Sequence, residues 1–324
     1  MKKFILLSIL VVSVWSVKAQ SRKHMASFSQ FGQYFNPSMT GMEGSQLKAL
    51  YRDQWTGFQD APRTLFISGE FDLANIKQTG TQASEASVLG AKNAFGLSLL
   101  HDTFGPYREN QLFLSYSSQV RLSEKLSLRA GAAVTYNNIY LDYMDLTMDQ
   151  SNDPEFQDLL SSDNNKINKV DVNVGVTLTA ENYYVGYALQ DAAEGKLTAK
   201  GDYLNRAFPR QHVIQAGYRK ALSEQFGVVV NGLYRYDTKL KETLEGQVKG
   251  VFNNTFWAGA GYRKDLAYTL TAGVRLNQVK LGYNYESVTG DARQMRNGSS
   301  NELVLTYQFN AGSAKDLGKK LVIW

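Results

Sequence analysis

The segment Val279-Lys280-Leu281-Gly282-Tyr283-Asn284-Tyr285-Glu286 decides the fold class. Its odd positions carry valine, leucine and two tyrosines, whereas its even positions carry lysine, glycine, asparagine and glutamate. Successive side chains of a β-strand point to opposite faces, so the segment is predicted to be a strand between an apolar and a polar environment. Residues 302–309 repeat the alternation, with leucine, tyrosine and phenylalanine on one face.

The same alternation recurs between residues 47 and 309 and predicts an all-β fold, a transmembrane antiparallel β-barrel of about 14 strands. A soluble β-sandwich would share the period of two. Three features together favour the outer membrane: charged residues and glycine on the polar face of strand after strand, an N-terminal secretion signal, and aromatic strand ends. The expected strands cover 46–56, 63–73, 88–100, 108–121, 125–138, 168–179, 182–190, 210–221, 225–237, 242–252, 255–263, 266–276, 278–288 and 300–309.

Tyrosines gather at or near the ends of these strands, on the apolar face. Tyrosine rings suit the two membrane interfaces, where the ring is buried and the hydroxyl group stays in water. We expect an aromatic girdle that includes Tyr51, Tyr116, Tyr136, Tyr183, Tyr218, Tyr236, Tyr262, Tyr268, Tyr283 and Tyr307.

The N-terminus has the parts of a signal peptide over residues 1–19. Lys2 and Lys3 precede an apolar run, and Val17-Lys18-Ala19 resembles a cleavage site that would leave Gln20 first. The apolar run is too short for a membrane-spanning helix, and no later run approaches the roughly 20 apolar residues that such a helix needs. The chain has no cysteine, which excludes disulfides, a thiol nucleophile and thiolate metal sites.

Connection lengths give an independent test of the barrel, because bacterial barrels have short periplasmic turns and longer extracellular loops. From the fourth strand onward, short turns at 123–124, 180–181, 223–224, 253–254 and 277 alternate with long polar loops at 139–167, 191–209 and 289–299. The stretch 74–87 departs from this rule and is interpreted as a periplasmic insertion. Within the first long loop, residues 153–160 have the proline and acidic residues of a helix start.

Charged residues occupy the polar face of most predicted strands. An arginine or lysine that faced lipid near the bilayer midplane would cost about 2–4 kcal/mol. We therefore expect these side chains to face the lumen, either as ladders of opposite charge or as the walls of an aqueous channel. They are Lys48, Arg52, Glu70, Asp72, Arg121, Arg129, Asp171, Arg219, Arg235, Glu245, Lys249, Arg263, Arg275, Lys280, Glu286 and Glu302.

The sequence lacks the motifs of an enzyme or a cofactor site. His24, His101 and His212 lie far apart and have no carboxylates at metal-ligand spacing, so no metal site is expected. There is no Gly-x-Ser-x-Gly elbow and no phosphate-binding glycine loop. The net charge of +5 is modest and indicates a basic lumen, and an exported protein is not expected to bind nucleic acid. We expect no catalytic residue and no cofactor.

The region before and through the first strands resembles the PorP/SprF family of Bacteroidota outer-membrane proteins. The resemblance rests on Gln33-Tyr34-Phe35-Asn36-Pro37 with Gly41, on residues 51–58 and on residues 61–64. The second of these stretches reads Tyr-Arg-Asp-Gln-Trp-Thr-Gly-Phe, and the third reads Ala-Pro-Arg-Thr. The matching motif residues are Asn36, Pro37, Gly41, Tyr51, Arg52, Gln54, Trp55, Gly57, Phe58 and Pro62. The long stretch 74–87 and the tail 310–324 depart from the family pattern.

The resemblance implies a non-enzymatic barrel of the type IX secretion system that anchors a secreted surface protein or assists its export. The implied partners are outer-membrane lipid, a gliding adhesin-like cargo with a type B C-terminal domain, and other secretion or gliding motility components. The alternative is a diffusion channel or transporter for small solutes. We expect a signal peptide over 1–19, an N-terminal segment over 20–45 as a candidate plug, the barrel over 46–309 and a periplasmic tail over 310–324. Arg52 is predicted to hold the Asn36–Pro37 element against the wall, since a guanidinium can bind carbonyl oxygens.

Overall fold

The computed structural model describes residues 23–73, 92–142, 166–197, 209–237, 242–289 and 298–309, together with Leu321, Ile323 and Trp324. The predicted signal peptide, the 74–87 insertion and the 153–160 helix lie outside the described residues. Within the described part of the chain, no helix is long and apolar enough to cross a membrane.

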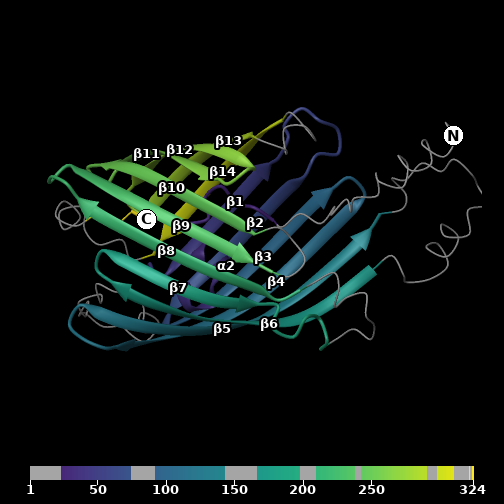
Figure 1. The fold of residues 1–324 in the computed structure, drawn as a ribbon, viewed down its shortest axis with the longest axis horizontal. Helices are drawn as coiled ribbons and strands as arrows, with labels where there is room; N and C mark the ends of the chain where they lie inside the picture. Colours follow the sequence, from purple (N-terminus) through teal and green to yellow (C-terminus); the bar gives the residue numbers. More distant parts are fainter. Residues whose placement is uncertain are drawn as a thin grey trace, which may run out of the picture.

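Fourteen antiparallel strands form one closed barrel, which confirms the predicted fold (Figure 1). Each strand pairs with its neighbours in sequence, and β1 pairs with β14 to close the ring. Closure gives every strand a neighbour on both sides, as the interior of a bilayer favours. The strands are β1 (Gln46–Asp53), β2 (Arg63–Asp72), β3 (Asn93–Phe104), β4 (Tyr107–Arg121), β5 (Leu126–Leu141), β6 (Lys166–Ala180), β7 (Tyr183–Gln190), β8 (Gln211–Ala221), β9 (Phe226–Tyr236), β10 (Thr243–Phe252), β11 (Phe256–Arg263), β12 (Ala267–Leu276), β13 (Val279–Val288) and β14 (Ser299–Gln308).

The outer surface of the barrel is apolar, because exposed and buried positions alternate along the strands. In β5, for example, Leu128 and Val134 are exposed, whereas Arg129 and Thr135 are buried. All ten tyrosines of the predicted girdle are exposed on this surface. The rings of Tyr262 and Tyr268, on adjacent strands, lie 5.0 Å apart. An apolar exterior with exposed tyrosines is typical of contact with lipid.

Short turns join the strands at one end of the barrel, which we call the short-turn end and assign to the periplasm. Asn253 and Asn254 between β10 and β11 have φ of 52° and 49°, and Asn277 between β12 and β13 has φ of 54°. Asparagine tolerates this left-handed region better than most residues, so turns of two or three residues can form there. The turn between β6 and β7 consists of residues 181–182, one residue later than predicted.

Several strand boundaries differ from the prediction, most clearly those of the first and third strands. The first strand ends at Asp53 rather than near residue 56, because Trp55 adopts φ of 56° and the chain turns. The third strand covers 93–104 instead of 88–100. Its end is set by a tight hairpin in which Gly105 has φ of 53° and Phe104 lies opposite Tyr107.

The segment before β1 lies inside the barrel. Residues 23–44, called here the N-terminal segment, include the short helix α2 (Gly32–Phe35) and the 3-10 turn η1 (Pro37–Met39). Its apolar side chains are almost completely buried and pack against inward-facing residues of the wall such as Leu50, Phe66 and Val213. Ile323 and Trp324 are also buried, in a cluster with Met39, so both ends of the chain contribute to the filled interior.

Candidate functional site

The candidate site is the barrel interior, where the N-terminal segment contacts nearly every strand. The segment begins near the end opposite the short turns, which we call the long-loop end. Lys23 bridges Asp102 and Glu109 there at 2.7 Å each, close to the hairpin between β3 and β4. It finishes at the short-turn end, where Ser45 accepts a hydrogen bond from the backbone N–H of Asp72. The segment therefore runs the length of the lumen.

Near the long-loop end, a buried ionic network lies between the segment and the wall. Arg52 contacts Glu286 at 2.7 Å, and Arg263 contacts both Glu286 and Glu245 at 3.0 Å. Arg235 approaches Glu245 at 3.6 Å. With Glu302 the network holds three positive and three negative side chains, so pairing compensates the cost of burying each charge. We call this six-residue set the upper network: Arg52, Arg235, Arg263, Glu245, Glu286 and Glu302.

Glu302 connects the upper network to the N-terminal segment. Its carboxylate accepts hydrogen bonds of 2.9 Å from the backbone N–H groups of Ala26 and Ser27, and it also accepts from the Ser27 hydroxyl. Asn284 donates to it at 3.1 Å, and Arg52 at 3.4 Å. These donors replace the hydration that the fully buried carboxylate loses. Glu302 is thus the main attachment of the segment at this level.

His24 is a neutral member of the same region. The Arg235 guanidinium lies 2.6 Å from its Nδ1, and because arginine has no acceptor, Nδ1 must accept this hydrogen bond. Nδ1 therefore carries no proton, and its contact of 3.4 Å with the Glu245 carboxylate is not bridged by hydrogen. Burial, assisted by the charges of Arg263 and Arg235, lowers the pKa of His24 to about 3. The imidazole is therefore uncharged at neutral pH.

Arg129 of β5 holds the middle of the segment. Its guanidinium donates to the carbonyl oxygens of Ser38 at 3.0 Å and Thr40 at 2.7 Å. It also donates to Gln119 Oε1 at 2.7 Å and Ser117 Oγ at 3.0 Å on β4. Arg129 is fully buried, so these contacts replace its lost hydration. The fork of donors fixes the backbone of the segment against the wall.

Asn36 fixes the adjoining turn. Its side-chain oxygen accepts from Ser38 N–H at 3.0 Å and caps η1, and its amide group donates to Thr177 Oγ1 on β6 at 3.1 Å. Pro37 begins η1, where its fixed φ suits the turn and its missing N–H is not needed. The Asn-Pro pair therefore forms a rigid turn that is bonded to the wall.

Glycines in the barrel wall, which have no side chain, leave room for the Asn36–Pro37 turn. A Cβ atom on Gly131 would lie 2.5 Å from backbone atoms of Pro37 and Ser38, and one on Gly175 would lie 2.0 Å from Asn36 Oδ1. Contacts below 3.0 Å cannot be accommodated without movement. Four inward-facing glycines form this groove, which we call the glycine groove: Gly96, Gly131, Gly175 and Gly186.

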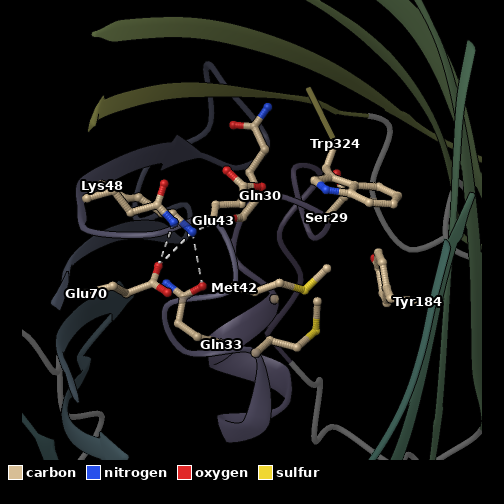
Figure 2. Close-up of a pocket in the computed structure, with 12 residues that line it drawn as sticks. Ser29, Gln30, Gln33, Met42, Glu43, Lys48, Glu70, Tyr184 and Trp324 are labelled. Carbon is tan, nitrogen blue, oxygen red and sulfur yellow. Dashed lines mark hydrogen bonds and ion pairs between the residues drawn. The ribbon is translucent and has the colours of Figure 1, made fainter. Parts of the chain in front are cut away.

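A third group of contacts lies near the short-turn end (Figure 2). Lys48 contacts Glu70 at 2.8 Å and donates to Gln30 O at 2.6 Å and to Gln33 Oε1 at 3.3 Å. Glu70 also accepts from the backbone N–H of Gly41 at 2.6 Å. Gly41 has φ of 69°, a conformation that glycine adopts without strain.

Glu43 is the last charged residue of the segment. Burial alone would raise the pKa of its carboxyl group, but the ammonium groups of Lys280 and Lys48 hold that pKa below its ordinary value. Lys280 Nζ lies 3.1 Å from Glu43 Oε2. A small cavity remains between the segment and the wall, lined by Ser29, Gln30, Gly32, Gln33, Met39, Met42, Glu43, Gln46, Lys48, Glu70, Tyr184 and Trp324.

The predicted lumen charges differ in burial: thirteen are buried, two are partly buried and one is exposed. Most are buried in the interior. Asp171 accepts hydrogen bonds from the backbone N–H groups of Ala193 and Gly195, in the loop after β7. Asp72 and Arg219 are partly buried near the short-turn end, and Arg121 is exposed there. The buried members are Lys48, Arg52, Glu70, Arg129, Asp171, Arg235, Glu245, Lys249, Arg263, Arg275, Lys280, Glu286 and Glu302.

The motif residues do not form a single site, and the predicted contact between Arg52 and the Asn36–Pro37 element is wrong. Arg52 binds Glu286 and Glu302 instead, and Arg129 binds the backbone after Pro37. Sequence alternation placed both arginines inside the barrel but carried no information about their partners. Asn36, Pro37 and Gly41 belong to the segment, whereas Tyr51 is on the outer face.

The remaining motif residues form a turn at the long-loop end, residues 54–62, called here the rim turn. The Gln54 N–H donates to Pro62 O at 2.9 Å, which closes the turn. The Trp55 ring packs edge-on against Phe104 at 5.8 Å. Gly57 has φ of 94°, and the Phe58 side chain is 41% exposed. The rim turn thus presents aromatic residues beside the mouth of the barrel.

The three histidines occupy separate places, with His101 beside Asn110 and His212 beside Tyr187. Among the residues that the structure describes, no group of three histidine, aspartate or glutamate side chains is arranged to hold a metal ion.

A family model for the type IX secretion system membrane protein PorP/SprF matches residues 17–307. The chain belongs to the PorP/SprF family. As a PorP/SprF protein with a closed barrel and an apolar outer surface, it is an outer-membrane component of type IX secretion. A search of curated proteins finds no match.

Solved structures similar to this PorP/SprF protein are outer-membrane barrels. The monoaromatic hydrocarbon channel CymD aligns with a TM-score of 0.51 at 14% identity, covering 86% of this chain and 92% of CymD. A FadL homologue of Pseudomonas aeruginosa aligns with a TM-score of 0.43 at 12% identity, covering 85% and 93% of the two chains. At these identities the likeness concerns the fold alone.

Proposed function

We propose that this PorP/SprF protein anchors a secreted surface protein at the outer membrane or assists its export, and that it does so without catalysis. The observation that carries the proposal is the N-terminal segment across the lumen. Asn36 and Pro37 lie in the glycine groove, and Arg129 binds the carbonyl oxygens that follow. A barrel filled in this way is suited to be a rigid scaffold rather than an open passage.

The contacts of the segment support a permanent plug. Donors and acceptors of the segment are paired with the wall at both ends and in the middle, by Glu302, Arg129 and Lys48. Releasing the segment would break its hydrogen bonds to these charged side chains, each worth about 1.5–3 kcal/mol. Thermal opening of all three attachments together would therefore be rare.

The partner surface in this proposal is the long-loop end, because loops on a rigid scaffold commonly carry binding. The predicted loops 139–167, 191–209 and 289–299 belong to it, although most of their residues lie outside the described part of the chain. The rim turn provides described residues at the same end. Its backbone is held to β14 by a hydrogen bond of 2.9 Å from Thr56 N–H to Ser299 O. Phe58 and Trp55 would then be aromatic contacts for the cargo.

Co-purification from the native outer membrane tests the proposal. A tagged barrel is expected to recover a secreted protein with a type B C-terminal domain, together with other secretion or gliding motility components, identified by mass spectrometry. The double variant of Trp55→Ala with Phe58→Ala should lose the cargo but keep the barrel. A matched control is Phe256→Ala, which removes an exposed aromatic side chain at the short-turn end. Recovery of no secreted protein by the unmodified barrel would contradict the proposal.

The alternative function is a diffusion channel for small solutes, as the name of the structural neighbour CymD suggests for that protein. Planar-bilayer recording separates the two functions. The filled lumen favours the absence of a steady conductance of solute size. A steady open conductance of the unmodified protein would support the channel instead.

A further inference from the structure

Trp324 occupies a well-formed site on the inner wall near the short-turn end. Its side chain is only 7% exposed. The ring packs edge-on against Tyr184 of β7, with centroids 5.1 Å apart, and the Arg219 guanidinium of β8 lies 4.2 Å above it. Stacking of arginine on an indole ring is among the strongest cation–π contacts. Figure 2 shows Trp324 and Tyr184 on the side of the cavity opposite Lys48 and Glu70.

The backbone and the preceding side chains of this tail have partners as well. Lys249 of β10 is 1% exposed and donates to Trp324 O at 3.1 Å and to Ser29 Oγ at 2.8 Å. The Leu321 side chain lies over Gly227, where an added Cβ would be 2.8 Å from it. Ile323 is 2% exposed. The site thus recognises an indole, a carbonyl group and aliphatic side chains.

The ammonium group of Lys249 joins the tail to the N-terminal segment, since one atom binds both. Met39 of the segment belongs to the same apolar cluster as Trp324 and Tyr184. Occupation of the site by the tail therefore completes the packing of the segment at the short-turn end.

We propose that the inner wall formed by Tyr184, Arg219 and Lys249 is a binding site for a short apolar peptide that carries an indole. The chain's own Leu321, Ile323 and Trp324 occupy this site and act as a latch on the N-terminal segment. The three wall residues come from three different strands and are positioned by the barrel itself. The site should therefore bind such a peptide in trans when the tail is released, and this inference does not rest on the proposed anchoring function.

The experiment uses the full-length chain with Leu321→Ala, Ile323→Ala and Trp324→Ala, which removes from the site the side chains that fill it. The purified variant is titrated by calorimetry with the synthetic peptide Lys-Lys-Leu-Val-Ile-Trp, the sequence of residues 319–324. Saturable binding to the variant, and none to the unmodified protein, is the expected result. The peptide with alanine in place of tryptophan should bind at least about 100-fold more weakly, since a buried indole is lost. Equal binding to both proteins, or no binding to either, would overturn the proposal.

Wall variants identify the site within the same experiment. Arg219→Ala in the emptied background should weaken peptide binding about tenfold, as expected for the loss of a cation–π contact. Lys249→Met should abolish saturation. Lys264→Met, in an exposed turn at the long-loop end, is the matched control and should leave binding unchanged. Wall variants that bind as well as the control would refute the assigned site.

A second measurement does not depend on emptying the site. The chain contains no cysteine, so Ile323→Cys supplies a single thiol. In the otherwise unmodified protein this thiol should react with a water-soluble maleimide at least about 100-fold more slowly than a thiol at exposed Ser223. Adding Arg219→Ala should accelerate the reaction. Equal rates at the two positions would show that the tail is not held, and would overturn the latch.

Discussion

Replacing Glu302 by glutamine should release the beginning of the N-terminal segment. One oxygen of the carboxylate accepts from Ala26 N–H and Arg52, and the other from Ser27 and Asn284. A glutamine amide has one oxygen and one NH₂ group. Whichever way the amide is turned, its NH₂ group faces at least two donors, and Arg52 loses one of its two carboxylate partners.

The size of the effect follows from the burial of Glu302, which is 0% exposed. Breaking a buried pair by neutralising one member costs about 3–5 kcal/mol. Because 1.4 kcal/mol corresponds to about a factor of ten, the open state of this part of the segment should become about 10² to 4 × 10³ times more populated. The wall should remain closed, since the strand pairing does not depend on this side chain.

Thiol labelling measures this opening. Ala26→Cys places a single cysteine at a position that is 3% exposed, in a chain that otherwise has none. Its maleimide reaction rate should rise by a factor of about 10² to 4 × 10³ when Glu302→Gln is added. Asp53→Asn is the control, because Asp53 meets Arg63 at 3.6 Å and Arg63 is 64% exposed, a surface pair worth about 0–1 kcal/mol. A rise no larger than that of the control would refute the role given to Glu302.

Three further perturbations test other parts of the interior. Gly131→Ala should displace the Asn-Pro turn and lower the urea midpoint of the purified barrel. Gly246→Ala is the control, because nothing lies within 4 Å of its added Cβ, and it should not lower the midpoint. Equal midpoints for the two variants would contradict the role given to the glycine groove. Asn36→Ala should destabilise the barrel by about 1–3 kcal/mol, because Thr177 and the η1 turn lose their partner, and unchanged urea unfolding would contradict this. Because the pKa of His24 is lowered in the folded protein, unfolding takes up a proton below about pH 6.5. The stability that the neutral imidazole contributes is therefore present above that pH and is lost as pH falls toward about 3. The loss is up to about 1.4 kcal/mol per pH unit. Relative to His24→Gln, the unmodified protein should lose stability over this range, and parallel pH profiles would show that the imidazole is not buried as described.

The strands were predictable because a period of two is local information that needs no knowledge of neighbours. The strand boundaries that differ from the prediction are those set by a neighbouring strand or turn. The end of β3 depends on its hairpin with β4 and on the left-handed Gly105, and β1 stops where Trp55 turns.

The partners of the interior residues were not predictable from the sequence. Alternation indicates that Arg52 and Arg129 face inward, but Arg52 meets a residue that is 250 positions away only because the ring closes. The tail was assigned to the periplasm, and nothing in residues 319–324 indicated that Trp324 would contact Arg219 and Lys249. A usable signal for the glycine groove was present, since glycine at an inward position leaves room for close approach of another backbone.

The position of Glu302 and Arg52 has a consequence for biogenesis. They are directly opposite each other across the junction of the last and first strands, and Glu302 also holds the backbone of Ala26 and Ser27. The N-terminal segment, which precedes β1, is therefore bonded to the inner side of the junction between β1 and β14. We therefore expect sealing of the wall and entry of the segment to be energetically coupled, because Glu302 binds both Arg52 of the first strand and the backbone of the segment. A closed barrel without the segment would then leave Glu302 without its bonds to Ala26 and Ser27 and should be less stable than the filled barrel.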